Sequence, residues 1–173
     1  MSQKITPRQH EIQLGDNEFI VTKTDEVGKI TYANPVFIAL SGYSEFELLG
    51  SQHNIVRHPD MPRSVFNLLW TTIKSGDEFH GYVKNLSKDG SFYWVFATVT
   101  PSFSTDTGNI IGFYSVRRKP DRKKLAVIQD LYREMLMAEK SEGRRDAIAA
   151  GNDVLNTVLK KADKTYYEFI LTL

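Results

Sequence analysis

The strongest constraint on the fold is a change of hydrophobic period near the middle of the chain. Residues 62–74 carry apolar side chains at helical spacing, and Ser75-Gly76 ends that pattern. Residues 79–86 and 91–103 are instead two long stretches of β-forming residues with a period of two. They are joined by a segment containing Asp89-Gly90, and an Asp-Gly pair is a strong signal for a hairpin. The sequence therefore predicts a helix followed by a long antiparallel hairpin.

Shorter elements precede and follow this hairpin. Asn34-Pro35 suits the N-cap and first turn of a short helix, and Ser44 with Glu47 forms a capping box for a second one. β-Forming residues also occupy three further segments, 19–24, 30–33 and 110–116. We therefore predict an α+β domain with a five-stranded antiparallel sheet and short helices on one face.

Composition and charge narrow the class of protein. The chain has 173 residues with 22 basic and 21 acidic side chains, a formal net charge of +1, so we expect no nucleic-acid partner. No apolar run approaches ~18 residues, and no signal-peptide core is present, so we expect a cytoplasmic protein without direct membrane insertion. The absence of cysteine excludes disulfides, thiolate nucleophiles and cysteine-ligated metal sites.

The composition changes again at Pro120, where strand-like segments cease. Two amphipathic helices are predicted beyond it, separated by the break at residues 141–143. They either fold back on the domain or pair with another chain, and we favour pairing because residues 166–173 are too apolar to face water. The predicted organisation is an N-terminal cap (1–18), a globular sensor domain (19–119) and a helical signalling segment (120–173).

A polar loop at residues 53–62 is the first candidate for function. It places His53, Arg57, His58 and Asp60 within ten residues, and its two prolines stiffen the backbone. A guanidinium, two imidazoles and a carboxylate can bind a polar or phosphorylated ligand. The alternative is a loop that satisfies itself, with Arg57 paired to Asp60.

Several motifs together resemble a PAS domain over roughly residues 18–120. They are Gly28-Lys29-Ile30-Thr31-Tyr32-Ala33-Asn34, Ser41-Gly42-Tyr43-Ser44, and Lys88-Asp89-Gly90-Ser91-Phe92-Tyr93-Trp94-Val95. Three features resemble more narrowly the N-terminal PAS domain of bacterial aerotaxis (energy-taxis) receptors: Asn54 through Pro62, with its unusual string Val56-Arg57-His58-Pro59-Asp60-Met61-Pro62, the helix bearing Trp70, and Val83-Lys84-Asn85. That resemblance implies non-covalent binding of FAD, here by a stand-alone PAS protein.

The resemblance also implies a set of cofactor-binding residues around a cleft between helices and sheet. These are Asn34, His53, Arg57, His58, Asp60, Trp70, Asn85 and Trp94. Asn85 can both donate to and accept from a flavin ring, and Arg57 suits a phosphate or the ribityl and adenine edges. For Asn34 a plain N-cap role remains open, and for both tryptophans a plain core role.

The function implied is a redox sensor rather than an enzyme. It would pass the redox state of FAD to a membrane-bound or cytoplasmic chemoreceptor-type partner, or act as a homodimer, because the sequence shows no methyl-accepting or membrane-spanning module. The absence of cysteine also removes the cysteinyl-flavin adduct of photosensory LOV domains. Haem ligation by His53, His58 or His80, binding of another small ligand, a cofactor-free interaction module and a flavin-dependent oxidoreductase are the alternatives.

Overall fold

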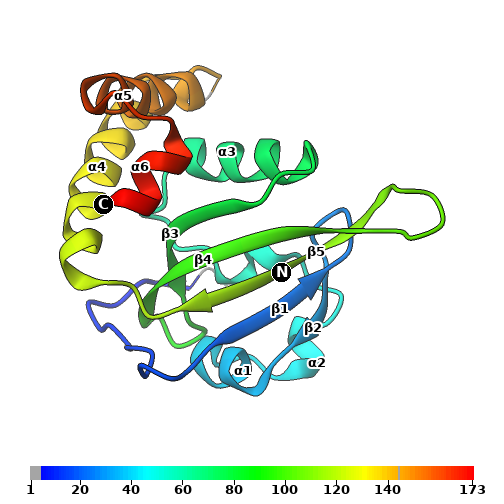
Figure 1. Cartoon of the computed structure of the whole chain (residues 1–173). Helices are drawn as coiled ribbons and strands as arrows, with labels where there is room; N and C mark the ends of the chain where they lie inside the picture. Colours follow the sequence, from blue (N-terminus) through cyan, green and yellow to red (C-terminus); the bar gives the residue numbers. More distant parts are fainter. Residues whose placement is uncertain (1–4, 144) are drawn as a thin grey trace.

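A five-stranded antiparallel sheet organises the computed structural model, which describes residues 5–143 and 145–173 (Figure 1). Its strand order is β2-β1-β5-β4-β3, so β3 and β2 are the edges. The strands are β1 (Ile20–Thr24), β2 (Ile30–Ala33), β3 (Phe79–Leu86), β4 (Phe92–Phe103) and β5 (Ile110–Arg118). The predicted sheet, including the hairpin at Asp89-Gly90, is confirmed.

Short helices between β2 and β3 cover one face of the sheet, which we call the inner face (Figure 1). They are α1 (Pro35–Ser41), α2 (Glu45–Leu48), the 3-10 turn η1 (His53–Val56) and α3 (Arg63–Lys74). Helices α1 and α2 begin at the N-cap residues predicted from the sequence. The Asn34 Oδ1 atom accepts a hydrogen bond from the Phe37 amide, and Ser44 and Glu47 form a reciprocal capping box.

The register of the central strands decides which side chains reach the inner face. Val83 pairs with Val95, Asn85 with Tyr93, and Ala97 with Arg117, and these positions point to the inner face. Side chains one residue along the same strands point to the opposite, outer face because side chains alternate in a strand. The outer set includes Tyr82, Phe96 and Trp94.

The C-terminal segment contains three helices rather than the two predicted. They are α4 (Arg122–Ser141), α5 (Ala147–Ala162) and α6 (Tyr166–Thr172). The second predicted helix is divided because Asp163 adopts a left-handed conformation (φ 52°), and a capping box formed by Thr165 and Glu168 then starts α6.

These helices fold back on the domain, which is the alternative that the sequence left open and that we did not favour. They gather beside β3 (Figure 1). On the outer face, Tyr132 of α4 packs against Trp94 with ring centroids 6.2 Å apart, and α6 buries Phe169 and Ile170. The apolar C-terminus is thus covered largely by its own chain.

The C-terminal helices also satisfy the backbone at the free edge of β3. The Tyr132 hydroxyl donates to the Tyr82 carbonyl at 2.9 Å, and the Tyr166 hydroxyl donates to the His80 carbonyl at 3.0 Å. Unpaired carbonyls of an edge strand would otherwise be buried without a partner, which costs free energy.

The N-terminal cap packs along the start of β4, and its residues 1–4 lie outside the described part of the chain. The Arg8 amide donates to the Gly90 carbonyl and the Ile12 amide to the Phe92 carbonyl, at 2.7 and 2.8 Å. Leu14 is buried. Within residues 5–143 and 145–173, none of the helices combines the length and apolarity needed to cross a bilayer.

We predict that Tyr132→Phe lowers the free energy of unfolding by about 1–2 kcal/mol, because the buried Tyr82 carbonyl loses its donor while the ring is kept. The matched control is Tyr167→Phe on α6, whose side chain is exposed and should change stability by less than about 0.5 kcal/mol. Urea unfolding midpoints measure both. Equal effects of the two substitutions would show that the hydroxyl contact at the β3 edge is unimportant.

Candidate functional site

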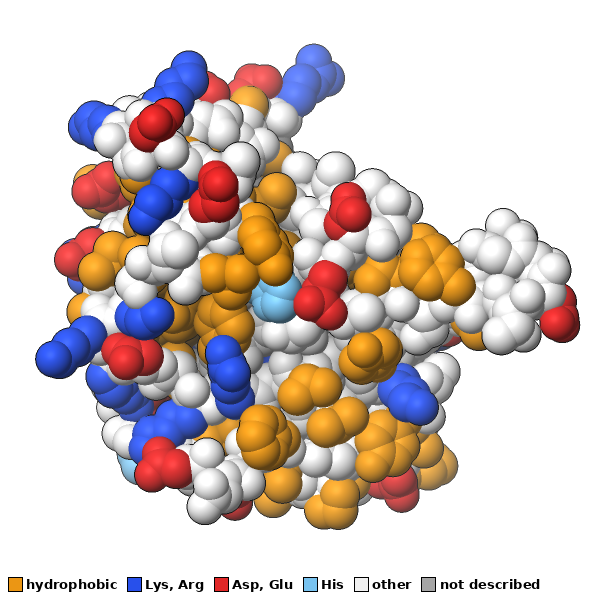
Figure 2. Space-filling view, viewed as in Figure 1, with side chains coloured by type: hydrophobic (Ala, Val, Ile, Leu, Met, Phe, Trp, Pro, Cys, Tyr) orange, Lys and Arg blue, Asp and Glu red, His pale blue; other side chains and the backbone are white. Residues whose placement is uncertain are grey.

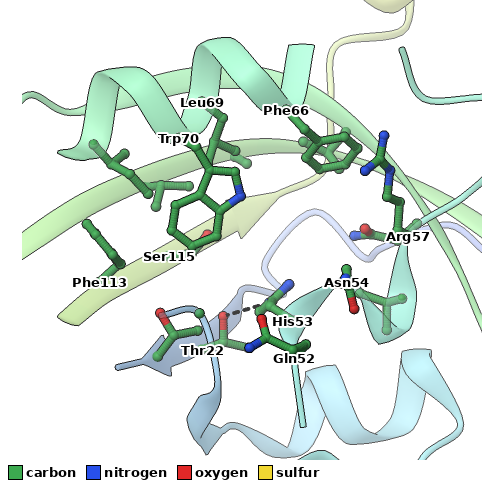
Figure 3. A pocket seen from close by; sticks show the side chains of 18 of the residues that line it. Thr22, Gln52, His53, Asn54, Arg57, Phe66, Leu69, Trp70, Phe113 and Ser115 are labelled. Atoms are coloured by element: carbon green, nitrogen blue, oxygen red, sulfur yellow. Dashed lines mark hydrogen bonds between the residues drawn. The ribbon is translucent and has the colours of Figure 1, made fainter. Parts of the chain in front are cut away.

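A cavity of about 370 Å³ lies between α3 and the inner face of the sheet. In Figure 3, Phe66, Leu69 and Trp70 project from α3 toward His53 and Thr22 on the opposite side. Trp70 meets Phe113 of β5 edge to face, with ring centroids 5.7 Å apart. Aromatic walls of this kind suit a flat, partly apolar ligand.

At one end of this cavity the backbone at Gly28 lies close to the Trp70 ring. Gly28, in the turn between β1 and β2, has φ +85°, and a Cβ there would lie 2.9 Å from the Trp70 ring. Only glycine combines this conformation with that contact. The turn therefore fixes the position of the indole against the cavity.

Four of the eight site residues expected from the sequence line the cavity. They are His53, Arg57, Trp70 and Asn85. His53 and Arg57 bracket the turn η1, and an antiparallel bridge joins Arg57 to Asn85 of β3. The loop and the sheet thus bring together residues that are about thirty positions apart in the sequence.

Asn34 and Trp94 do not line the cavity. The Asn34 side chain joins the start of α1 to β1, because Oδ1 accepts from the Val21 and Phe37 amides while Nδ2 donates to the Phe19 carbonyl. Trp94 points to the outer face, one residue out of phase with the cavity-lining positions of β4. The structure therefore places both side chains away from the cavity that holds the other expected residues.

His58 and Asp60 also lie away from the cavity, at the β3 edge. The His58 Nδ1 atom accepts from the Asp60 amide at 3.0 Å, and Asp60 forms an ion pair of 2.8 Å with Lys84. Burial, followed by the charge of Lys84, lowers the pKa of His58 to about 4. The alternative pairing of Arg57 with Asp60 is not formed, so Arg57 keeps its side chain at the cavity.

A polar network occupies the floor of the cavity. Arg117 of β5 donates from Nη2 to Thr22 Oγ1 at 2.6 Å and to His53 Nε2 at 2.7 Å. Since Nε2 accepts this bond, the proton of the neutral imidazole resides on Nδ1. Burial, and then the charge of Arg117, lower the pKa of His53 to about 3.

Three residues that line the cavity carry a buried polar group without a partner among the described residues. The groups are Asn85 Nδ2, Ser115 Oγ and Arg117 Nη1. Buried donors are normally paired, so unpaired ones at a cavity wall indicate a polar ligand. Arg117 was missed by sequence reasoning, although a charged residue at an inner position of an otherwise apolar strand is a recognisable signal.

The mouth of the cavity carries positive charge. The Arg57 guanidinium lies over the Phe66 ring, 4.2 Å from its centroid, and Arg63 lines the same opening. Burial and then the charge of Arg63 lower the pKa of Arg57. An anionic group bound between them would offset this repulsion.

Metal binding has less support in this geometry. Among the described residues, no group of three or more histidine, aspartate or glutamate side chains is placed to hold a metal ion. His53 already uses Nε2 to accept from Arg117, and His80 Nε2 lies 2.9 Å from Glu78 Oε1, away from the cavity lining.

Comparisons with known proteins agree with this architecture. A family model described as PAS fold matches residues 30–117. The chain is 39% identical to the aerotaxis receptor of Escherichia coli (strain K12) over 127 residues, which are 73% of this chain and 25% of the receptor. It is 32% identical to the nitrogen fixation regulatory protein of Klebsiella pneumoniae over 81 residues, 47% of this chain and 16% of that protein.

Solved structures show the same fold. The dark structure of the blue-light photoreceptor Aureochrome1 LOV aligns with a TM-score of 0.54 and 27% identity, covering 65% of this chain and 83% of that one. The chain thus matches most of a solved LOV domain, but it spans a quarter or less of the two curated relatives.

The low pKa of His53 gives a pH prediction. Unfolding returns the imidazole to its ordinary pKa of 6.5, whereas the folded imidazole takes up a proton only near pH 3. The unfolded state therefore binds the extra proton first, and the free energy of unfolding falls as the pH drops from 6.5 toward 3. We expect the His53 ring signals in ¹H–¹⁵N NMR spectra to stay in the neutral Nδ1–H form down to about pH 5.

The matching variant is His53→Gln, which removes the titrating ring. Its stability should fall less steeply with acid over the same pH window than that of the parent protein. A His53 titration with a midpoint at its ordinary pKa would contradict the buried network.

Proposed function

Because the chain belongs to the PAS-fold family, we propose that it is a redox sensor that holds FAD non-covalently in this cavity and passes the flavin's redox state to a separate signalling protein. The family match and the relatives confirm the resemblance found in the sequence motifs. The observation that carries the proposal is the set of unpaired buried polar groups in an aromatic-walled cavity.

The inner wall suits the ring system of a flavin. Asn85 Nδ2 and Ser115 Oγ are buried without partners among the described residues and can bond to a ring edge that alternates N–H and C=O groups. Phe66 and Trp70 on α3 offer apolar surface to its faces. A bound flavin supplies reversible uptake of electrons and protons, and this chain supplies the groups that hold it and respond to its charge.

Arg117 is the group through which a change of charge on the bound flavin would act on the protein. No acidic side chain bonds to its buried guanidinium among the described residues, and burial lowers its pKa to about 10. A buried cation without a carboxylate partner stabilises negative charge placed beside it. Changes of charge on a bound ring would therefore be felt by the Arg117, His53 and Thr22 network, and through it by strands β1 and β5.

The mouth favours FAD over a ligand without a polyphosphate. Arg57 and Arg63 place two cations at the opening, and a pyrophosphate is the group that two neighbouring guanidinium groups bind well. Haem is disfavoured because His53, the one histidine in the lining, already accepts a bond from Arg117. A cofactor-free module would leave Asn85 and Ser115 unpaired.

The outer face of the sheet offers a surface for the signalling partner. Hydrophobic side chains gather there over β1 and β2 (Figure 2). Tyr32 and Tyr114, both paired in register with Lys23, are exposed, as is Phe19. We infer a cytoplasmic protein without catalytic turnover, whose partner is a chemoreceptor-type protein or a second copy of this chain; the 39% identity to part of an aerotaxis receptor supports this assignment.

Our first functional prediction is that the purified protein is yellow, with the two absorption bands of a flavin. Heat or acid should release the flavin, because no cysteine is present for a thioether link, and chromatography should identify it as FAD. A colourless protein that cannot be reconstituted with FAD would refute the proposal. A Soret band would indicate haem instead.

Our second functional prediction is that Asn85→Ala and Arg57→Ala each weaken FAD binding about tenfold to a hundredfold, since each removes a hydrogen bond of about 1.5–3 kcal/mol when charge-assisted. Matched controls are Asn156→Ala and Arg133→Ala, which alter exposed side chains outside the cavity. Equilibrium dialysis measures affinity, and circular dichroism checks the fold. Full flavin retention by both cavity variants would make these residues structural.

A further inference from the structure

Glu139 of α4 is a buried carboxylate with an unusual set of partners. Its Oε1 atom accepts from the Ser64 amide at 2.9 Å and from the Ser64 hydroxyl at 2.6 Å, while Oε2 accepts from the Arg63 amide at 2.9 Å. Only 7% of the residue is exposed. A side chain from the C-terminal segment thus supplies the N-terminal cap of α3, the helix that carries Phe66 and Trp70.

No local residue could replace this cap. The N-cap position of α3 is Pro62, which makes no side-chain capping bond. The first turn of a helix exposes unpaired amides and carries partial positive charge, so a carboxylate there is favourable. Removal of Glu139 would therefore leave the Arg63 and Ser64 amides without partners.

Helix α5 packs tightly against the same place. A Cβ at Gly151 would lie 2.4 Å from Ser64 Oγ and 2.7 Å from Glu139 Oε1, closer than any real contact. The backbone of α5 can approach α3 only because residue 151 is glycine. Glu139, Ser64 and Gly151 therefore form one close contact, which we call the α3–α5 junction.

The α3–α5 junction places residues of both helices in the wall of the cavity. Ile148, one turn before Gly151 on α5, is part of the cavity lining, as is Arg63 at the start of α3. The wall is therefore completed by a segment outside the 30–117 region that matches the PAS family. Any motion of α5 away from α3 would change the opening of the cavity.

We propose that α5 is a movable wall of the cavity and that Glu139 is the positioning residue that holds it closed. While the α3–α5 junction is intact, Ile148 limits access to the cavity. When the junction opens, ligand can enter or leave, and α3 loses the cap that orders its first turn. The proposal concerns access to the cavity and holds for whichever ligand the cavity binds.

A cysteine probe tests this without any ligand, because the natural chain contains no cysteine. Ala97→Cys places a thiol on the cavity wall, where Ala97 is 2% exposed. Ala33→Cys is the matched control, since Ala33 is 3% exposed in β2 and does not line the cavity. The rate of reaction with a soluble disulfide reagent reports how often each thiol becomes accessible.

Two substitutions open the junction by different means. Glu139→Ala removes the cap, whereas Gly151→Ala forces α5 away and removes no polar group. In the Ala97→Cys background, each should raise the reaction rate by about tenfold or more, which corresponds to an opening equilibrium shifted by about 1.4 kcal/mol. Glu134→Ala on α4 and Asn156→Ala on α5 alter exposed side chains and should leave the rate unchanged.

The comparison of the two probes decides the matter. Acceleration at position 97 but not at position 33 supports a movable wall. Equal acceleration at both positions would mean that the substitutions only destabilise the whole domain, and no acceleration would mean that α5 does not control access; either result overturns the proposal. If Glu139→Ala does not fold, as judged by circular dichroism, Gly151→Ala gives the same decision.

Discussion

The free edge of strand β3 is the constraint on which the rest of the structure depends. An edge strand presents unpaired backbone groups, and here the hydroxyl groups of Tyr132 and Tyr166 bond to two of its carbonyls. Because both tyrosines come from the C-terminal segment, protecting the edge requires α4 and α6 to lie against the sheet. Once α4 lies there, Trp94 is covered on the outer face, and α5 is carried around to α3. Sheet, edge and cavity wall are thus parts of one packing arrangement.

The second constraint is a buried positive charge inside the cavity that has no negatively charged partner among the described residues. Arg117 is buried and bonds to neutral groups, the Thr22 hydroxyl and the His53 ring nitrogen. Such a cation is costly to bury unless a ligand compensates for it. The unpaired groups of Asn85 and Ser115 point to the same conclusion. The interior is therefore polar at positions where a domain without a ligand would be expected to be apolar, and the proposed cofactor rests on this feature.

The cavity and the exposed surface are linked by short paths through rigid elements. β5 carries Arg117 to the cavity floor, presents Tyr114 on the outer face, and leads into α4. α3 carries Trp70 on the cavity wall and is capped by Glu139 of α4. A change of charge in the cavity can therefore bias either the outer face or the docking of the C-terminal helices, and both lie where a partner could detect them.

The sequence by itself determined the elements and their order, because caps, turns and hydrophobic periods are local properties. Asp89-Gly90 specified the hairpin, and Asn34 and Ser44 specified helix starts, with no need for distant residues. Its resemblance to a known family also led to His53, Arg57, Trp70 and Asn85, which line the cavity. Only the tertiary structure decided which face of the sheet each side chain occupies and which distant elements are in contact. Both faces of β4 are apolar since helices cover each one, so the pattern could not show that Trp94 points away from the cavity. The pairing of Glu139 with α3 joins residues 75 positions apart, and no local signal specifies such a contact.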